Sequence, residues 1–120
     1  MATTSERRRF VRLPVPPHLG GPGVERHHMR LVDLSLGGAR VEHDHPFPEG
    51  FLCFLKLSPA LGGVWLQGEV VWSREAGRRE VGEGEWVVSH QSGLRFTLLT
   101  LGQREGLTAA LEILKAAEEG

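Results

Sequence analysis

The chain has 120 residues, a length that predicts one domain with a single hydrophobic core and leaves no room for a two-domain enzyme. Its 40% hydrophobic and 24% charged residues are typical of a globular protein, so we expect neither a disordered chain nor a membrane protein. Fourteen basic and fifteen acidic residues leave a net charge of −1, which argues against a general attraction to nucleic acid or anionic lipid and implies that any anion is bound locally.

The N-terminus is basic and polar. Residues 1–13 are predicted to form a flexible arm, and residues 14–120 the folded domain. The arm lacks the apolar stretch of a secretory leader, so we expect a cytoplasmic protein. The segment after it is rich in proline and glycine, so any strand there should be short or lie at a sheet edge. The arm contains four arginines: Arg7, Arg8, Arg9 and Arg12.

Alternating apolar residues predict five or six strands. Short strands with frequent turns are typical of an all-β barrel or sandwich. We expect a turn at residues 36–38, and interpret the charged, glycine-rich residues 74–85 as a mobile hairpin. The predicted strands cover about residues 24–35, 39–43, 51–57, 64–73, 86–88 and 94–98.

Two strands allow residue-level predictions. The single cysteine, Cys53, falls in an apolar run, which predicts a buried thiol and excludes an internal disulfide or a Cys-rich zinc site. In the strand over residues 64–73, strict alternation places Trp72 on the same inward face as Val70.

The C-terminal residues change to helical spacing. Leu107, Leu111 and Leu114 follow one another at steps of four and three, which predicts one amphipathic helix over about residues 101–118. The fold class is therefore mainly β, with one terminal helix.

Motifs of enzymes are absent: the sequence contains no phosphate-binding loop, no dinucleotide fingerprint, no zinc-protease helix and no nucleophile elbow, so we expect no enzymatic activity. His43 and His45 would share one side of a strand and could grip a metal. Without cysteine or carboxylate partners, exposed histidines are the simpler interpretation, and we expect no metal.

The arm offers guanidinium groups at a useful spacing. Arg8 and Arg12 are four residues apart, and in an extended chain they would point the same way about 13 Å apart. A guanidinium donates two parallel hydrogen bonds, which suits a phosphate or the O6/N7 edge of guanine. The alternative is a solvated, disordered tail. In that case the choice of arginine reflects composition, since the whole sequence favours arginine over lysine.

A second polar group follows the strand that ends near residue 35. Asp33 and Ser35 would lie about 7 Å apart on one strand face. The carboxylate suits the N1–H and N2–H₂ donors of guanine, and Gly38 would allow a positive φ or a close approach of a ligand. The alternative is an ordinary turn in which Asp33 and Ser35 bind local backbone amides.

Together, Arg8-x-x-x-Arg12 and Asp33-x-Ser35-x-x-Gly38 resemble the PilZ domain, a bacterial receptor module for cyclic di-GMP. Residues 38–41, 68–72 and 93–96 and the closing helix extend the resemblance over nearly the whole chain. It implies a six-stranded antiparallel split barrel with a helix over one opening, no enzymatic activity and no cofactor.

The resemblance also implies residue roles. Arg8 and Arg12 would clamp guanine edges and phosphates, Asp33 and Ser35 would bind a guanine, and Gly38 would let the ligand close in. Trp72 resembles an aromatic residue that stacks on guanine in some members, although core packing is an equal alternative. Two further arginines flank the clamp, Arg7 and Arg9, and the place of Arg7 is associated with an intercalated cyclic di-GMP dimer.

These expectations describe a receptor that binds cyclic di-GMP, orders its arm and presents a changed surface to a partner protein. A first alternative is a PilZ-like protein-interaction module that binds no nucleotide. A second is a small nucleic-acid-binding barrel, which the near-neutral charge and the absence of a basic, aromatic sheet face disfavour.

Overall fold

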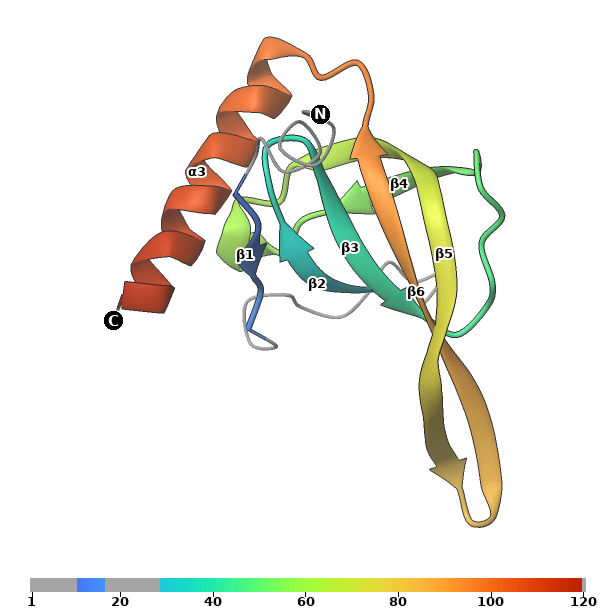
Figure 1. Cartoon of the computed structure of the whole chain (residues 1–120). Helices are drawn as coiled ribbons and strands as arrows, with labels where there is room; N and C mark the ends of the chain where they lie inside the picture. The colour runs from blue at the N-terminus through green and yellow to red at the C-terminus, as the bar shows by residue number, and fades with distance from the viewer. Residues whose placement is uncertain (1–10, 17–28, 120) are drawn as a thin grey trace, which may run out of the picture.

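The computed structural model describes residues 11–16 and 29–119. In these residues, six strands form one antiparallel sheet in the order β1-β2-β3-β6-β5-β4, and the sheet curls so that α3 packs beside β1 (Figure 1). The predicted fold class, mainly β with six antiparallel strands and a C-terminal helix, is confirmed. The elements are β1 (Leu13–Pro14), β2 (Arg30–Leu34), β3 (Gly38–His43), β4 (Leu52–Lys56), the 3₁₀ turn η1 (Pro59–Leu61), β5 (Trp65–Gly82), β6 (Glu85–Phe96) and α3 (Leu101–Glu119).

The first strand is short and lies at the sheet edge, as proline in this segment predicts. β1 pairs with β2 through Leu13–Leu34 and Pro14–Asp33. β2 occupies only the last part of the strand predicted over residues 24–35, and residues 17–28 lie outside the described residues.

The core lies between the inner face of the sheet and α3. Every second residue of β3 and β4 is buried in it, β6 adds Leu94, and α3 contributes Leu107, Ala110 and Leu114, which are at most 2% exposed. Cys53 is buried in this core, as predicted, and burial raises the pKa of its thiol to about 11.

The helix begins where its sequence provides a capping box. The Thr100 hydroxyl accepts a hydrogen bond from the Gln103 amide, and the Gln103 side chain accepts one from the Thr100 amide. α3 contacts β1 and η1, and its bounds agree with the predicted helix. Within the described ranges, no helix combines the length and the apolar character needed to cross a bilayer.

Residues 74–85 form a hairpin, as predicted, but its two arms are regular continuations of longer strands than the sequence indicates. β5 continues to Gly82 and β6 starts at Glu85 without the predicted break after residue 88, and the two strands pair along this length. Figure 1 shows their far halves projecting from the sheet as a two-stranded ribbon. Most side chains near the tip are exposed on both faces of the ribbon, so the sequence there lacks the alternation that identifies a half-buried strand.

The interpretation of His43 as an exposed histidine is wrong. His43 is 1% exposed and stacks on Phe47, whereas His45 is exposed. Its Nδ1–H donates to the His45 carbonyl, and its Nε2 accepts from the Ser92 hydroxyl at 2.7 Å. In the described part of the chain, no group of three or more His, Cys, Asp or Glu residues could hold a metal ion.

Gly38 begins β3 instead of ending a turn, and its φ is not among the positive values found at five other described glycines. A Cβ added at this position would lie 1.9 Å from the Leu94 carbonyl oxygen of β6. The structure therefore requires glycine here because two strands approach closely.

We predict that Gly38→Ala lowers the free energy of unfolding by about 3 kcal/mol, because backbone atoms of β6 cannot move away from the new methyl group. Gly102→Ala is the matched control, since the first atom met there is 4.0 Å away and alanine favours a helix by about 0.5 kcal/mol. Urea denaturation measures both. Equal stability of Gly38→Ala and the wild type would contradict the close strand approach.

We also predict that stability falls in mild acid because of His43. Burial lowers the pKa of His43 below its ordinary value of 6.5, an effect that His90 reinforces and the hydrogen bond to His45 opposes. The stability contributed by neutral His43 is present above pH 6.5, and it is lost as the pH falls towards the folded-state pKa, because the unfolded chain takes up the proton first.

Urea denaturation between pH 7.5 and about pH 5 measures this dependence. His43→Gln should flatten it, and the exposed His45→Gln should leave it unchanged. The same slope in wild type and His43→Gln would show that another group carries the acid sensitivity.

Candidate functional site

Ser35 shapes the turn between β2 and β3. Its hydroxyl oxygen accepts hydrogen bonds from the amides of Gly37 and Gly38, each at 3.2 Å, and its own amide donates to the Gly38 carbonyl at 2.9 Å. For Ser35, the turn interpretation of the motif is therefore confirmed. The serine holds the end of β2 in a defined position beside β3.

Asp33 forms an ion pair with Arg40. Its carboxylate lies 3.0 Å from Nη2 of Arg40, which is its direct partner across the β2–β3 ladder. The Asp33 side chain is 10% exposed and that of Arg40 33%. Asp33 thus binds a side chain of the neighbouring strand, and not the local backbone amide that a simple turn predicts.

Two β-bulges determine which way the site residues point. In β2 the register passes from Leu31–Val41 to Asp33–Arg40, so Val32 is the extra residue. A bulge reverses the face of the residues that follow it. It therefore places Asp33 on the outer face of the sheet although Leu31 lies in the core.

The second bulge is in β5. There the register passes from Val70–Leu94 to Trp72–Gly93, with Val71 as the extra residue. Val70 is 1% exposed, whereas Trp72 is half-buried on the opposite face. The predicted inward position of Trp72 is wrong, because strict alternation ignores the bulge.

The bulges bring the site residues into one row across four strands. Asp33, Arg40, Gly93 and Trp72 are successive cross-strand partners on β2, β3, β6 and β5. Cross-strand partners share a face, so all four lie on the outer face, with Asp33 and Trp72 roughly 14 Å apart at ~4.8 Å per strand. The neighbouring row faces the core and is apolar: Leu34, Ala39, Leu94 and Val70.

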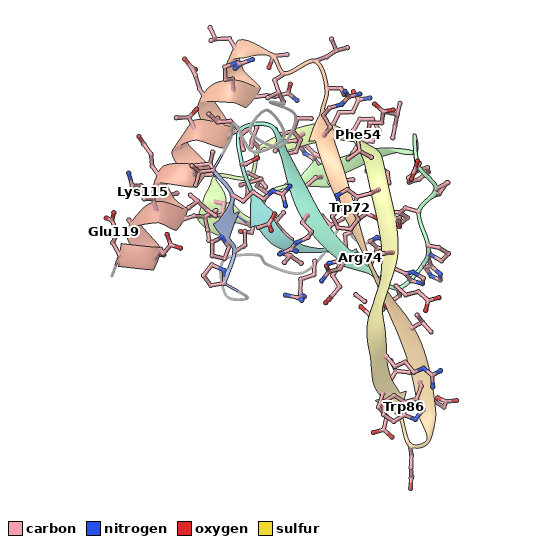
Figure 2. All side chains as sticks on the ribbon, in the orientation of Figure 1. Phe54, Trp72, Arg74, Trp86, Lys115 and Glu119 are labelled. Atoms are coloured by element: carbon pink, nitrogen blue, oxygen red, sulfur yellow. The ribbon has the colours of Figure 1, made fainter. Side chains whose placement is uncertain are left out.

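Trp72 lies against the backbone of β6. A Cβ added to Gly93 would lie 2.2 Å from Nε1 of Trp72, so the indole crosses the strand where the side chain is missing. The guanidinium carbon of Arg74 is 5.3 Å from the ring centroid, a cation–π contact. Figure 2 shows Trp72 and Arg74 close together on β5, well away from Trp86 near the ribbon tip.

The second arginine of the arm motif lies next to this row. Arg12 is exposed and directly precedes Leu13, which pairs with Leu34, so the backbone of Arg12 runs beside Ser35 at the end of β2. The other predicted arm residues lie outside the described residues: Arg7, Arg8 and Arg9.

Neither Arg40 nor Gly93 belongs to a motif that predicts a role from the sequence alone. Arg40 alternates with the core residues Ala39 and Val41, so its outward direction could have been inferred. Its closeness to Trp72 depends on the strand order and on the bulge at Val71, which the sequence does not signal. The assembled face offers carboxylate acceptors, guanidinium donors and an aromatic ring, which together suit an anionic ligand that carries a base.

The sequence matches a family model. The model described as PilZ domain matches residues 6–112. No curated protein matches the chain.

Solved structures share the fold. The PilZ domain of YcgR from Escherichia coli with c-di-GMP has a TM-score of 0.69 and 20% identity, over 94% of this chain and 95% of that chain. YcgR from Escherichia coli in complex with c-di-GMP has a TM-score of 0.68 and 19% identity, over 94% of this chain and 48% of that chain. The K. pneumonia MrkH–c-di-GMP complex has a TM-score of 0.69 and 17% identity, over 95% and 56%. This chain spans about half of the two longer chains, and at these identities the likeness shows the fold.

Proposed function

Because the chain belongs to the PilZ domain family, we propose that it is a receptor for cyclic di-GMP, which binds on the outer face of β2, β3, β6 and β5. The single observation that carries the proposal is the complete Asp33-x-Ser35-x-x-Gly38 motif at the end of β2, with Arg12 of the second motif directly beside it. Relatives of the same fold were solved with c-di-GMP.

Asp33 and Ser35 would recognise a guanine base. The two carboxylate oxygens of Asp33 accept from N1–H and N2–H₂ of guanine, and Ser35 holds the strand end in place. Trp72 would stack on a purine ring, since it lies half-buried on the same face. The roughly 14 Å between Asp33 and Trp72 exceeds the width of one purine, which suits a dinucleotide.

The arm would supply the cations. Arg8 and Arg12 bind phosphates and guanine edges, and Arg7 and Arg9 add charge beside them. An intercalated dimer of cyclic di-GMP carries four phosphates and needs more cationic partners than a single molecule with two. Docking of the arm on the sheet changes the surface that a downstream protein meets.

One observation favours a second candidate, a PilZ-like interaction module that binds no nucleotide. The Asp33 carboxylate is already paired with Arg40, so a ligand must displace an existing ion pair before it reaches the acceptor. In this alternative the pair is a permanent part of the sheet.

We predict that cyclic di-GMP binds the full chain with a dissociation constant of about ten micromolar or lower, measured by isothermal titration calorimetry. Asp33→Ala removes two charge-assisted hydrogen bonds and should weaken binding by about 3 kcal/mol, or roughly a hundredfold. Glu42→Ala is the matched control, since it breaks the exposed pair with Arg30 on the same two strands and should change affinity by less than about twofold.

The same titration tests the arm and the stoichiometry. Arg8→Ala and Arg12→Ala should each weaken binding at least tenfold, or about 1.4 kcal/mol, whereas Arg104→Ala on α3 should not. Two nucleotides per chain would indicate the intercalated dimer. Absence of binding in the wild type at concentrations of this order would leave the interaction module as the better account.

We further predict that Trp72→Leu weakens binding by about 1–3 kcal/mol, the usual contribution of one aromatic stack on a base. Trp86→Leu, at the exposed tip of the ribbon, is the control and should bind as the wild type does. If Trp72→Leu keeps full affinity and full thermal stability, the indole does not contact the ligand.

A further inference from the structure

We infer that Arg40 is an additional ligand-binding residue, which exchanges its ion pair with Asp33 for a phosphate of the bound dinucleotide. This inference rests on the proposed cyclic di-GMP receptor function. Arg40 belongs to neither sequence motif, and its place on the sheet is the reason to assign it this role.

The first observation is the position of Arg40 between Asp33 and Trp72 on the outer face of the sheet. Arg40 is the direct cross-strand partner of Asp33 on one side and of Gly93 on the other. Because Gly93 has no side chain, the indole of Trp72 lies over its backbone, one strand away from Arg40. A ligand that touches both Asp33 and Trp72 must therefore pass over Arg40.

The second observation is the state of the guanidinium. Of its five N–H donors, the Nη2 group faces Asp33 at 3.0 Å, while Nε is buried and has no hydrogen-bond partner in the described part of the molecule. A buried, unsatisfied donor on a charged group is unfavourable, and an acceptor brought by a ligand removes that penalty. One third of the Arg40 side chain is exposed to an approaching anion, and Nε would become accessible as the guanidinium turns away from Asp33 in the exchange.

Two other ion pairs on the same sheet face show what is different about Arg40. Arg30–Glu42 and Arg95–Glu69 are shorter, at 2.6 and 2.7 Å, and their arginines are 48% and 65% exposed. Their guanidinium groups are well solvated, whereas Arg40 combines a longer contact, deeper burial and an unsatisfied Nε.

Competition for hydrogen-bond acceptors then favours the exchange. When guanine N–H groups bind the Asp33 carboxylate, they compete with Arg40 for its oxygens. The guanidinium, whose Nε already has no acceptor, then needs a new one. A phosphate between the base on Asp33 and the base on Trp72 supplies it, because Nε–H and an Nη–H form a fork that fits two phosphate oxygens.

The test compares Arg40→Met and Arg40→Lys with the control Arg30→Met, by calorimetric titration of the full chain with cyclic di-GMP. Arg40→Met removes the cation, and Arg40→Lys keeps the charge beside Asp33 but lacks the fork. We expect both Arg40 variants to bind about tenfold more weakly or worse, and Arg30→Met to stay within about twofold of the wild type.

A second readout reports the contact without relying on affinity. The Nε–H correlation of Arg40 in a ¹H–¹⁵N spectrum, assigned by its absence from the Arg40→Lys spectrum, should shift when cyclic di-GMP is added to the wild type. Thermal melting shows whether each variant is folded, and Arg40→Lys covers the case in which Arg40→Met does not fold.

The outcomes separate the two proposals. Wild-type affinity of Arg40→Lys, or an unmoved Nε–H signal at saturating ligand, overturns the role of Arg40 while the receptor function stands. No binding by the wild type removes both.

Discussion

The site depends on a single geometric constraint, the position of two one-residue bulges. In an antiparallel sheet a side chain points either into the core or out of it, and only an extra residue changes that parity within a strand. Val32 and Val71 are such residues, and they border the row of Asp33, Arg40, Gly93 and Trp72 from opposite sides. Without them, Asp33 and Trp72 would face the core, where a carboxylate would be unpaired and an indole would displace the packed row of Leu34 and its neighbours.

Much of the fold follows from local patterns that the sequence shows directly. The leucine spacing of α3, the buried Cys53 and the edge position of the proline-rich β1 are properties of residues close together in the chain, so composition and periodicity predict them. Charged residues and glycines predict the hairpin at residues 74–85, but not the full length of β5 and β6, because their far halves have solvent on both sides and therefore no hydrophobic alternation. The burial of His43 is not predictable from its neighbours in sequence, because it depends on the hydrogen bond to Ser92, which lies on a strand distant in the chain.

The candidate site also contains residues that a local motif predicts and residues that only the tertiary fold brings together. Asp33, Ser35 and Gly38 form a contiguous motif, so their joint position at one strand end was predictable, and the two motifs meet at Arg12. The reason why position 38 requires glycine is not predictable from the motif. The atom that excludes a side chain there belongs to Leu94, on a strand distant in sequence. Arg40 and Gly93 become part of the site only through the strand order β2-β3-β6-β5, which no local pattern encodes.

The candidate site combines strands that the core holds in place with one ion pair that a ligand could exchange. Asp33, Arg40 and Trp72 stand on strands whose opposite face is the packed core, so binding requires little ordering of the sheet. A close-packed core resists rearrangement, so in the proposed receptor the sheet is the rigid part of the site. Among the described residues, the guanidinium of Arg40 is the group that we infer to change partners, since its Nη2 contacts Asp33 and its Nε is unsatisfied. In the proposed receptor, a ligand whose base binds Asp33 and whose phosphate binds Arg40 satisfies both groups at once, which favours a nucleotide over a neutral nucleoside.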